Sequence, residues 1–141
     1  MHPFRPGDDA EARVLVREFD ADALAGLREA VLGYATACGM SRDRAIDVML
    51  AVHELAANAV CHGPGHGRLQ LHVTASALHC EVSDPGTSSS DGRAVPWPVE
   101  QGHGLWLIHA AADHVRVTSG PNGSLITMVF TLPVAADGTG R

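Results

Sequence analysis

The 141-residue chain contains no lysine, and all ten of its basic residues are arginines. This absence excludes a lysine-dependent phosphate loop and covalent catalysis through a side-chain amine. Acidic residues outnumber basic ones, and the net charge of −6 argues against binding to nucleic acid, which requires a basic face. Backbone amides are therefore the obvious groups to hold any bound phosphate.

Cysteine is also scarce, with only Cys38, Cys61 and Cys80 present. They form no C-x-x-C pair, and their odd number argues against a disulfide framework. No apolar run approaches the ~18 residues of a membrane span. The first residues, MHPFRPGDDAEA, lack the apolar centre of a signal peptide. We therefore expect a cytoplasmic protein that does not bind membranes.

The length predicts a single domain over residues 1–141, with a core from about 12 to 133. Residues 12–19 (ARVLVREF) are a plausible strand. Asp20 or Asp22 can cap a first helix, which Gly39 ends, and Ser41 can cap a second. Apolar residues recur at helical spacing along both segments.

Alternation of apolar and polar residues predicts two strands, at about 69–74 and 78–84. The following stretch, about 85–103, is rich in Ser, Gly and Pro and indicates a functional loop or lid. A third helix is predicted from Leu105 through Val115, then a strand at 116–119, a Pro-Asn-Gly turn and a last strand at 124–132. This order predicts a two-layer α/β sandwich, with a largely antiparallel sheet covered by helices on one face.

The segment HELAANAVCHG places Glu54 and Asn58 four residues apart, so both emerge on one face of the second helix. The stripe from Asp47 to His62 contains no Lys or Arg. It is either the solvated face of an amphipathic helix or a pair of oxygen ligands facing Mg²⁺ and a hydroxyl group. The spacing alone does not decide between them.

Asp84 shares the parity of three apolar residues in its strand, which directs its carboxylate toward the core. A buried carboxylate needs a hydrogen-bond donor, and the exocyclic amine of a purine is one candidate. The alternative is that Asp84 caps its own turn, because Pro85 and Gly86 follow it directly.

The sequence Gly102-His103-Gly104-Leu105 opens the third predicted helix. Glycines at a helix N-terminus leave backbone N–H groups that can point at a phosphate. A flexible hinge is the alternative interpretation.

Three stretches in this order, ELAANAVCHG, VSDPG and GHGLWLIH, together with a later strand threonine, resemble the GHKL ATPase superfamily. The resemblance covers about residues 19–133. It implies the Bergerat ATP-binding fold, with a mixed sheet and a mobile lid, and it implies ATP and Mg²⁺ as ligands.

The resemblance also implies a role for each matching residue. Glu54 resembles the general base, and Asn58 the Mg²⁺ ligand. Asp84, with Gly86, resembles the adenine-reading group. The remaining matches resemble the phosphate-contacting turn, namely Gly102, His103, Gly104 and Leu105, and the threonine that assists Asp84, namely Thr127.

A domain of this size is most similar to the anti-sigma-factor serine/threonine kinases of actinobacteria. Their known behaviour implies a sigma factor and a STAS-type antagonist as partners, and a possible homodimer. Two alternatives remain: a nucleotide-dependent partner-switching scaffold with weak or absent kinase activity, and a zinc protein that uses some of the nine histidines.

Overall fold

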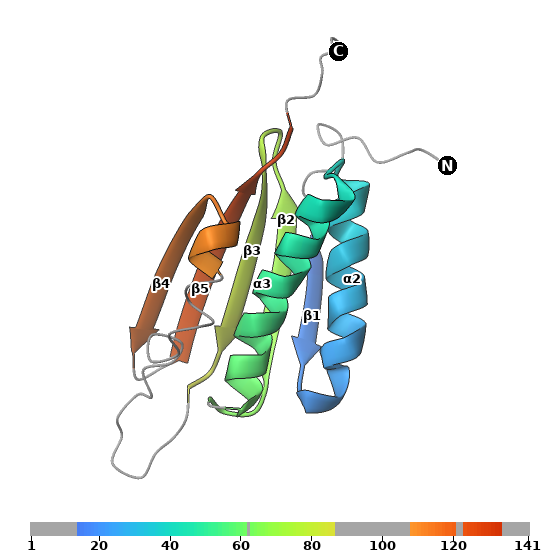
Figure 1. Cartoon of the computed structure of the whole chain (residues 1–141). Helices are drawn as coiled ribbons and strands as arrows, with labels where there is room; N and C mark the ends of the chain where they lie inside the picture. The colour runs from blue at the N-terminus through green and yellow to red at the C-terminus, as the bar shows by residue number, and fades with distance from the viewer. Residues whose placement is uncertain (1–13, 62, 87–107, 121–122, 134–141) are drawn as a thin grey trace.

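The computed structural model describes residues 14–61, 63–86, 108–120 and 123–133, drawn in colour in Figure 1. The elements, in chain order, are β1 (Leu15–Phe19), a short 3₁₀ turn η1 (Ala21–Ala23), α2 (Leu24–Ala37), α3 (Arg42–Cys61), β2 (Gly67–Val73), β3 (Ala77–Asp84), β4 (His114–Gly120) and β5 (Gly123–Thr131). Residues 108–111 are also helical. None of the described helices has the length and apolar character needed to cross a membrane.

The five strands form one sheet in the order β1-β2-β3-β5-β4, and all four pairings are antiparallel. Helices α2 and α3 lie together over one face of this sheet (Figure 1). The predicted two-layer α/β architecture is thus confirmed. The sheet differs from the mixed sheet that the resemblance implied, because the described strands include no parallel pair.

Side-chain oxygens begin both helical segments where the sequence predicted caps. Asp20 Oδ1 accepts hydrogen bonds from the backbone N–H groups of Asp22 and Ala23, at 3.0 and 3.1 Å. Ser41 Oγ accepts one from Arg44 N at 3.1 Å at the start of α3. Each oxygen satisfies N–H groups that have no partner within the helix, which fixes where each helical segment begins.

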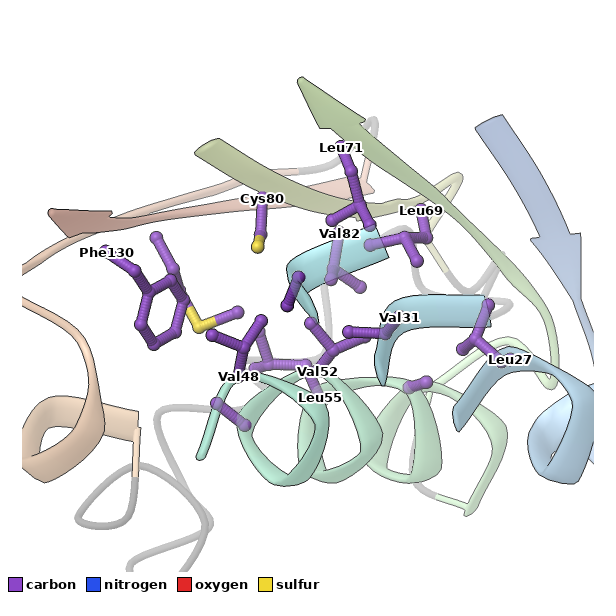
Figure 2. Packing of buried hydrophobic residues seen from close by; sticks show 14 of the residues in the cluster. Leu27, Val31, Val48, Val52, Leu55, Leu69, Leu71, Cys80, Val82 and Phe130 are labelled. Carbon is purple, nitrogen blue, oxygen red and sulfur yellow. The ribbon is translucent and has the colours of Figure 1, made fainter. Parts of the chain in front are cut away.

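The hydrophobic core lies between the helices and the sheet (Figure 2). Leu27 and Val31 of α2 and Val52 and Leu55 of α3 point toward Val82 of β3, and all five are buried. The burial follows the helical period in α3 and alternates in the strands, as the sequence pattern predicted. This core fixes which face of β3 turns toward α3.

The third predicted helix ends earlier in the chain than the sequence pattern predicted. Val115 lies in β4, paired with Met128 of β5, and not in a helix. Asp113 separates the two elements, because its carboxylate accepts hydrogen bonds from both the backbone and the side chain of Thr131. Pairing with β5 thus overrides the local helical spacing that included Val115. The start of this helix and most of the predicted lid fall within residues 87–107, outside the described part of the chain.

Candidate functional site

Asp84 ends β3 with its side chain on the helix-covered face, as the alternation predicted. Only 7% of the residue is exposed. Its Oδ1 accepts a hydrogen bond from Gly86 N at 2.7 Å, so the capping role that the sequence left open is also present. Gly86 has a φ of 84°, a left-handed conformation that glycine adopts readily. One buried carboxylate therefore both forms the turn and lies on the sheet face that α3 covers.

The β4–β5 hairpin turns directly against this strand end. Gly123 begins β5 with a φ of 122°, and a Cβ there would clash with the backbone carbonyl of Asp84. The absence of a side chain thus lets the hairpin approach the backbone of β3. The next residue, Ser124, is paired directly with Asp84 and is 6% exposed. Because opposite residues of an antiparallel pair share a face, Ser124 lies beside Asp84 on the helix-covered side.

Thr127, predicted to assist Asp84, does not lie in this site. It is paired with Glu81 of β3 and Arg116 of β4, on the sheet face that α2 and α3 leave uncovered. The reason is the two-residue period of a strand, because Thr127 is three residues from Ser124 and so points to the opposite side. Ser124, and not Thr127, therefore lies next to Asp84. Counting strand positions forward from the Pro-Asn-Gly turn was the sequence signal that could have found Ser124.

Glu54 and Asn58 lie in the last two turns of α3, at the end of the molecule where β3 ends and β5 begins (Figure 1). Glu54 is half-buried, whereas Asn58 is only 6% exposed. Within the described residues, the buried Asn58 Nδ2 makes no hydrogen bond. A buried amide without a partner costs free energy of about 1–3 kcal/mol, so a ligand that satisfies it is favoured.

The side chains at this end suit a hard cation that takes most of its ligands from a bound phosphate and from water. Asn58 offers a carboxamide oxygen, and Glu54 offers a carboxylate one turn earlier. Magnesium is commonly bound by one or two protein oxygens together with phosphates and waters. The described residues contain no cluster of three or more His, Cys, Asp or Glu that could hold a metal ion alone. The donor set therefore fits Mg²⁺ bound with a phosphate.

A hollow of about 310 Å³ also adjoins Asp84, but it belongs to another surface. Its walls include Glu18, Arg68 and Ser83, which are paired in one row across β1, β2 and β3 on the uncovered sheet face. Among the described lining residues, none comes from α3. The hollow thus opens on the sheet face away from α3, the helix that carries Asn58.

The predicted phosphate turn, Gly102, His103, Gly104 and Leu105, lies outside the described residues. The site as described therefore contains one acidic and one hydroxyl group at the sheet end, and one carboxylate and one amide on the facing helix. Such a set can recognise an amine-bearing ring on one side and a hydrated cation on the other.

Comparison with protein families finds one domain family that matches most of the chain. The model of the histidine kinase-like ATPase domain matches residues 18–130. The chain belongs to this family. The match includes Glu54, Asn58, Asp84 and Ser124, so every described residue of the site lies inside the family domain. No match was found among curated proteins.

Among solved structures, this ATPase domain is similar to the RsbU and RsbW domains of Rv1364c from Mycobacterium tuberculosis. The TM-score is 0.65 at 18% identity, and the match covers 85% of this chain. The chain spans 33% of the length of that structure. At this identity the likeness establishes a shared fold and nothing further.

Proposed function

We propose that this ATPase-family domain binds Mg-ATP between α3 and the ends of β3 and β5, and acts as an anti-sigma-factor serine/threonine kinase in the cytoplasm. It would phosphorylate a Ser or Thr of a STAS-type antagonist and sequester a sigma factor when the antagonist is phosphorylated. The observation that carries the proposal is a buried Asp84–Ser124 pair facing the helix that bears Glu54 and Asn58.

Adenine would be recognised at the sheet end. The Asp84 carboxylate accepts a hydrogen bond from the exocyclic amine, and Ser124 beside it can donate to a ring nitrogen or hold a water between them. A guanine presents a carbonyl at the same position, so two acceptors would face each other. The proposed arrangement is therefore selective for adenine nucleotides.

The phosphates would lie along the last turns of α3. Asn58 would hold Mg²⁺, and the ion would supply positive charge to stabilise the negative charge of the phosphates during transfer. Backbone amides of Gly102, His103, Gly104 and Leu105 would contact the same phosphates. Because the chain has no lysine, the phosphates would be held by backbone amides and the metal ion.

Glu54 would act on the attacking group. It accepts the proton of the acceptor Ser or Thr hydroxyl as the oxygen bonds to the γ-phosphorus, and the bond from that phosphorus to the β–γ bridging oxygen breaks. ADP leaves, and the phosphate remains on the antagonist. The half-buried position of Glu54 leaves its carboxylate open to an incoming side chain.

The binding half of the proposal is tested by thermal unfolding with Mg-ATP, Mg-ADP and no nucleotide. A ligand at a hundredfold its dissociation constant adds ~2.7 kcal/mol to the free energy of unfolding, which raises the Tm by roughly ten degrees. We expect a Mg²⁺-dependent rise in the wild type that Asn58→Ala largely loses. No rise with any purine nucleotide would exclude the nucleotide site.

The catalytic half is tested with Glu54→Gln and a Ser-containing antagonist of the STAS type. Removing a general base lowers the transfer rate by about 10² to 10⁴, while the dissociation constant for Mg-ATP should stay near that of the wild type. Asp47→Asn, an exposed position on the same helix, is the matched control. Normal transfer by Glu54→Gln contradicts the base assignment. Binding of both ligands without transfer by the wild type supports the alternative, a partner-switching scaffold.

A further inference from the structure

The three cysteines of the chain lie in three different environments. Cys80, in the middle of β3, is fully buried, and burial raises the pKa of its thiol. Cys38 is half-buried and directly follows α2. Cys61 is exposed and is the last residue of α3. Because thiol–disulfide exchange requires an accessible thiolate, Cys61 is the cysteine best placed to react with a reagent in solution.

Cys61 shares a face of α3 with the two residues that this helix contributes to the proposed site. Asn58 precedes it by three residues and Glu54 by seven, which correspond to about one and two helical turns. At 3.6 residues per turn, the three side chains emerge within an arc of about 60°. Cys61 therefore lies on the same side of α3 as the proposed magnesium ligand, at the end of the molecule where β3 also ends (Figure 1).

Backbone hydrogen bonds hold this end of α3 in place. Gly63 N donates to Asn58 O at 3.1 Å, and Gly65 N donates to Ala59 O at 3.0 Å. Both bonds satisfy carbonyls of the last turn that lack partners within the helix. Gly65 has a φ of 98°, a conformation that glycine adopts readily. The backbone therefore fixes where Cys61 lies relative to Asn58.

An observation that is independent of the thiol points to a ligand beside Cys61. Asn58 is only 6% exposed, and its Nδ2 has no hydrogen-bond partner among the residues that the structure describes. Leaving a buried amide without a partner is unfavourable, so a ligand that satisfies it is favoured. Cys61 lies about 4.5 Å further along the helix axis. A group attached to this thiol would thus compete for space with a ligand bound at Asn58.

We propose that Cys61 is a modification site, at which exchange with a low-molecular-weight disulfide places a mixed disulfide beside Asn58 and blocks the binding of Mg-ATP. This inference rests on the proposed function. It adds control of the nucleotide site by the thiol–disulfide balance of the surroundings.

The reaction needs no oxidant other than the disulfide itself. The Cys61 thiolate attacks one sulfur of the reagent, a new S–S bond forms, and the S–S bond of the reagent breaks. The other half leaves as a thiolate and takes up the proton that Cys61 lost. The Cys61 sulfur is thereby oxidised and the leaving sulfur is reduced. An excess of small thiol reverses the exchange.

A glutathione adduct is long enough to cover Asn58 from Cys61. An extended tripeptide spans at most about 10 Å, against the 4.5 Å or so that separates the two residues along α3. Glutathione also carries more carboxylates than amines, so the adduct repels the phosphates of a nucleotide. Both its volume and its charge oppose Mg-ATP.

The experiment treats wild type, Cys61→Ser and Cys38→Ser with oxidised glutathione. Intact mass spectrometry counts the adducts, circular dichroism checks the fold, and calorimetry gives the dissociation constant of Mg-ATP. We expect one adduct on wild type and on Cys38→Ser, and none on Cys61→Ser. The Mg-ATP dissociation constant should rise at least about tenfold in both adducts and return after reduction with dithiothreitol. Treated Cys61→Ser should bind Mg-ATP as the untreated wild type does.

Methyl methanethiosulfonate supplies a control matched in position, because it attaches a small, uncharged methylthio group to the same sulfur. This adduct should bind Mg-ATP nearly as well as the untreated protein. The reciprocal effect is measured on the unmodified chain and does not depend on the adduct remaining folded. Mg-ATP at tenfold its dissociation constant should slow the reaction of Cys61 with oxidised glutathione about tenfold, because bound nucleotide covers the thiol.

An adduct at Cys61 that leaves the Mg-ATP dissociation constant unchanged overturns the inference, as does a reaction rate that Mg-ATP does not slow. Reaction at Cys38 in place of Cys61 also overturns it. An equal loss of affinity with the methylthio group would show that the size and charge of the adduct do not matter, and would overturn the proposed block. All of these results leave the proposed function standing. A wild type that binds no Mg-ATP before treatment overturns both.

Discussion

At the scale of single residues, Asp84 combines a structural role in its turn with the role proposed for it in recognising adenine. Its Oδ1 closes the turn with Gly86 N, while its position on the helix-covered face places it next to Ser124 and not Thr127. The two candidate hydroxyls are three residues apart in β5, so they point to opposite faces of the sheet. Substituting Ser124 and Thr127 one at a time can therefore test which hydroxyl group contributes to adenine binding.

We expect Ser124→Ala to weaken adenosine binding about five- to tenfold, because a buried hydroxyl hydrogen bond contributes about 1–1.5 kcal/mol. Thr127→Ala, on the other face, should leave the adenosine dissociation constant unchanged. Calorimetric titration of both variants gives the comparison directly. Equal losses in the two variants, or a loss in Thr127→Ala alone, would contradict the placement of Ser124 in the site.

At the scale of elements, the site depends on how closely the β4–β5 hairpin approaches the end of β3. Gly123 permits this approach, since a Cβ there would run into the Asp84 carbonyl and the φ of 122° is unfavourable for other residues. By contrast, Gly33 lies within α2, with nothing within 4 Å of where its Cβ would be. Substitution by alanine should therefore change the free energy of unfolding in opposite directions at the two glycines.

We expect Gly123→Ala to lower the free energy of unfolding by about 2–4 kcal/mol, because the clash and the left-handed backbone act together. Gly33→Ala should raise it by about 0.5–1 kcal/mol, the advantage of alanine over glycine inside a helix. Urea unfolding followed by circular dichroism measures both. A Gly123→Ala variant as stable as the wild type would show that the hairpin does not press on Asp84.

At the scale of the whole molecule, three titrating groups give stability the same dependence on pH. Burial is the main cause that lowers the pKa of His53, whose Nδ1 lies 3.4 Å from a guanidinium nitrogen of Arg28. Burial is also the main cause that lowers the pKa of His79, whose ring stacks on that of His72 with 4.6 Å between the ring centres. Hydrogen bonds from Thr131 lower the pKa of Asp113. In each case the folded chain binds the proton more weakly than the unfolded chain does, so protonation favours the unfolded chain.

The free energy of unfolding should therefore fall in two stages as the pH falls. The first stage begins near the ordinary histidine value of 6.5, because the unfolded chain protonates these histidines before the folded chain does. The second begins near 3.8, where the contribution of the Asp113 carboxylate is lost as the pH falls through its lowered value.

Urea unfolding at half-unit steps from pH 7.5 to 3 measures this profile. His79→Gln should flatten the first stage, and Asp113→Asn the second, after correction for the stability of each variant at pH 7.5. Stability that increased on acidification from pH 6.5 to 5.5 would contradict the lowered pKa of the two histidines.

The sequence by itself determined most of the elements and the face that each of them buries. Helical spacing placed Glu54 and Asn58 on one side of α3, and alternation placed Asp84 on the core face of β3, because both periods are local properties of the backbone. The ordered motifs indicated the ATPase superfamily, in agreement with the family to which the chain belongs.

Only the tertiary structure decided which residues meet across the sheet. Register between β3 and β5 placed Ser124, and not Thr127, next to Asp84, and the pairing of β4 with β5 placed Val115 in a strand and not in the predicted helix. The Arg44–Asp113 contact joins residues 69 positions apart and carries no local pattern. Strand register and ion pairs between distant segments depend on how whole elements pack, which no short stretch of sequence specifies.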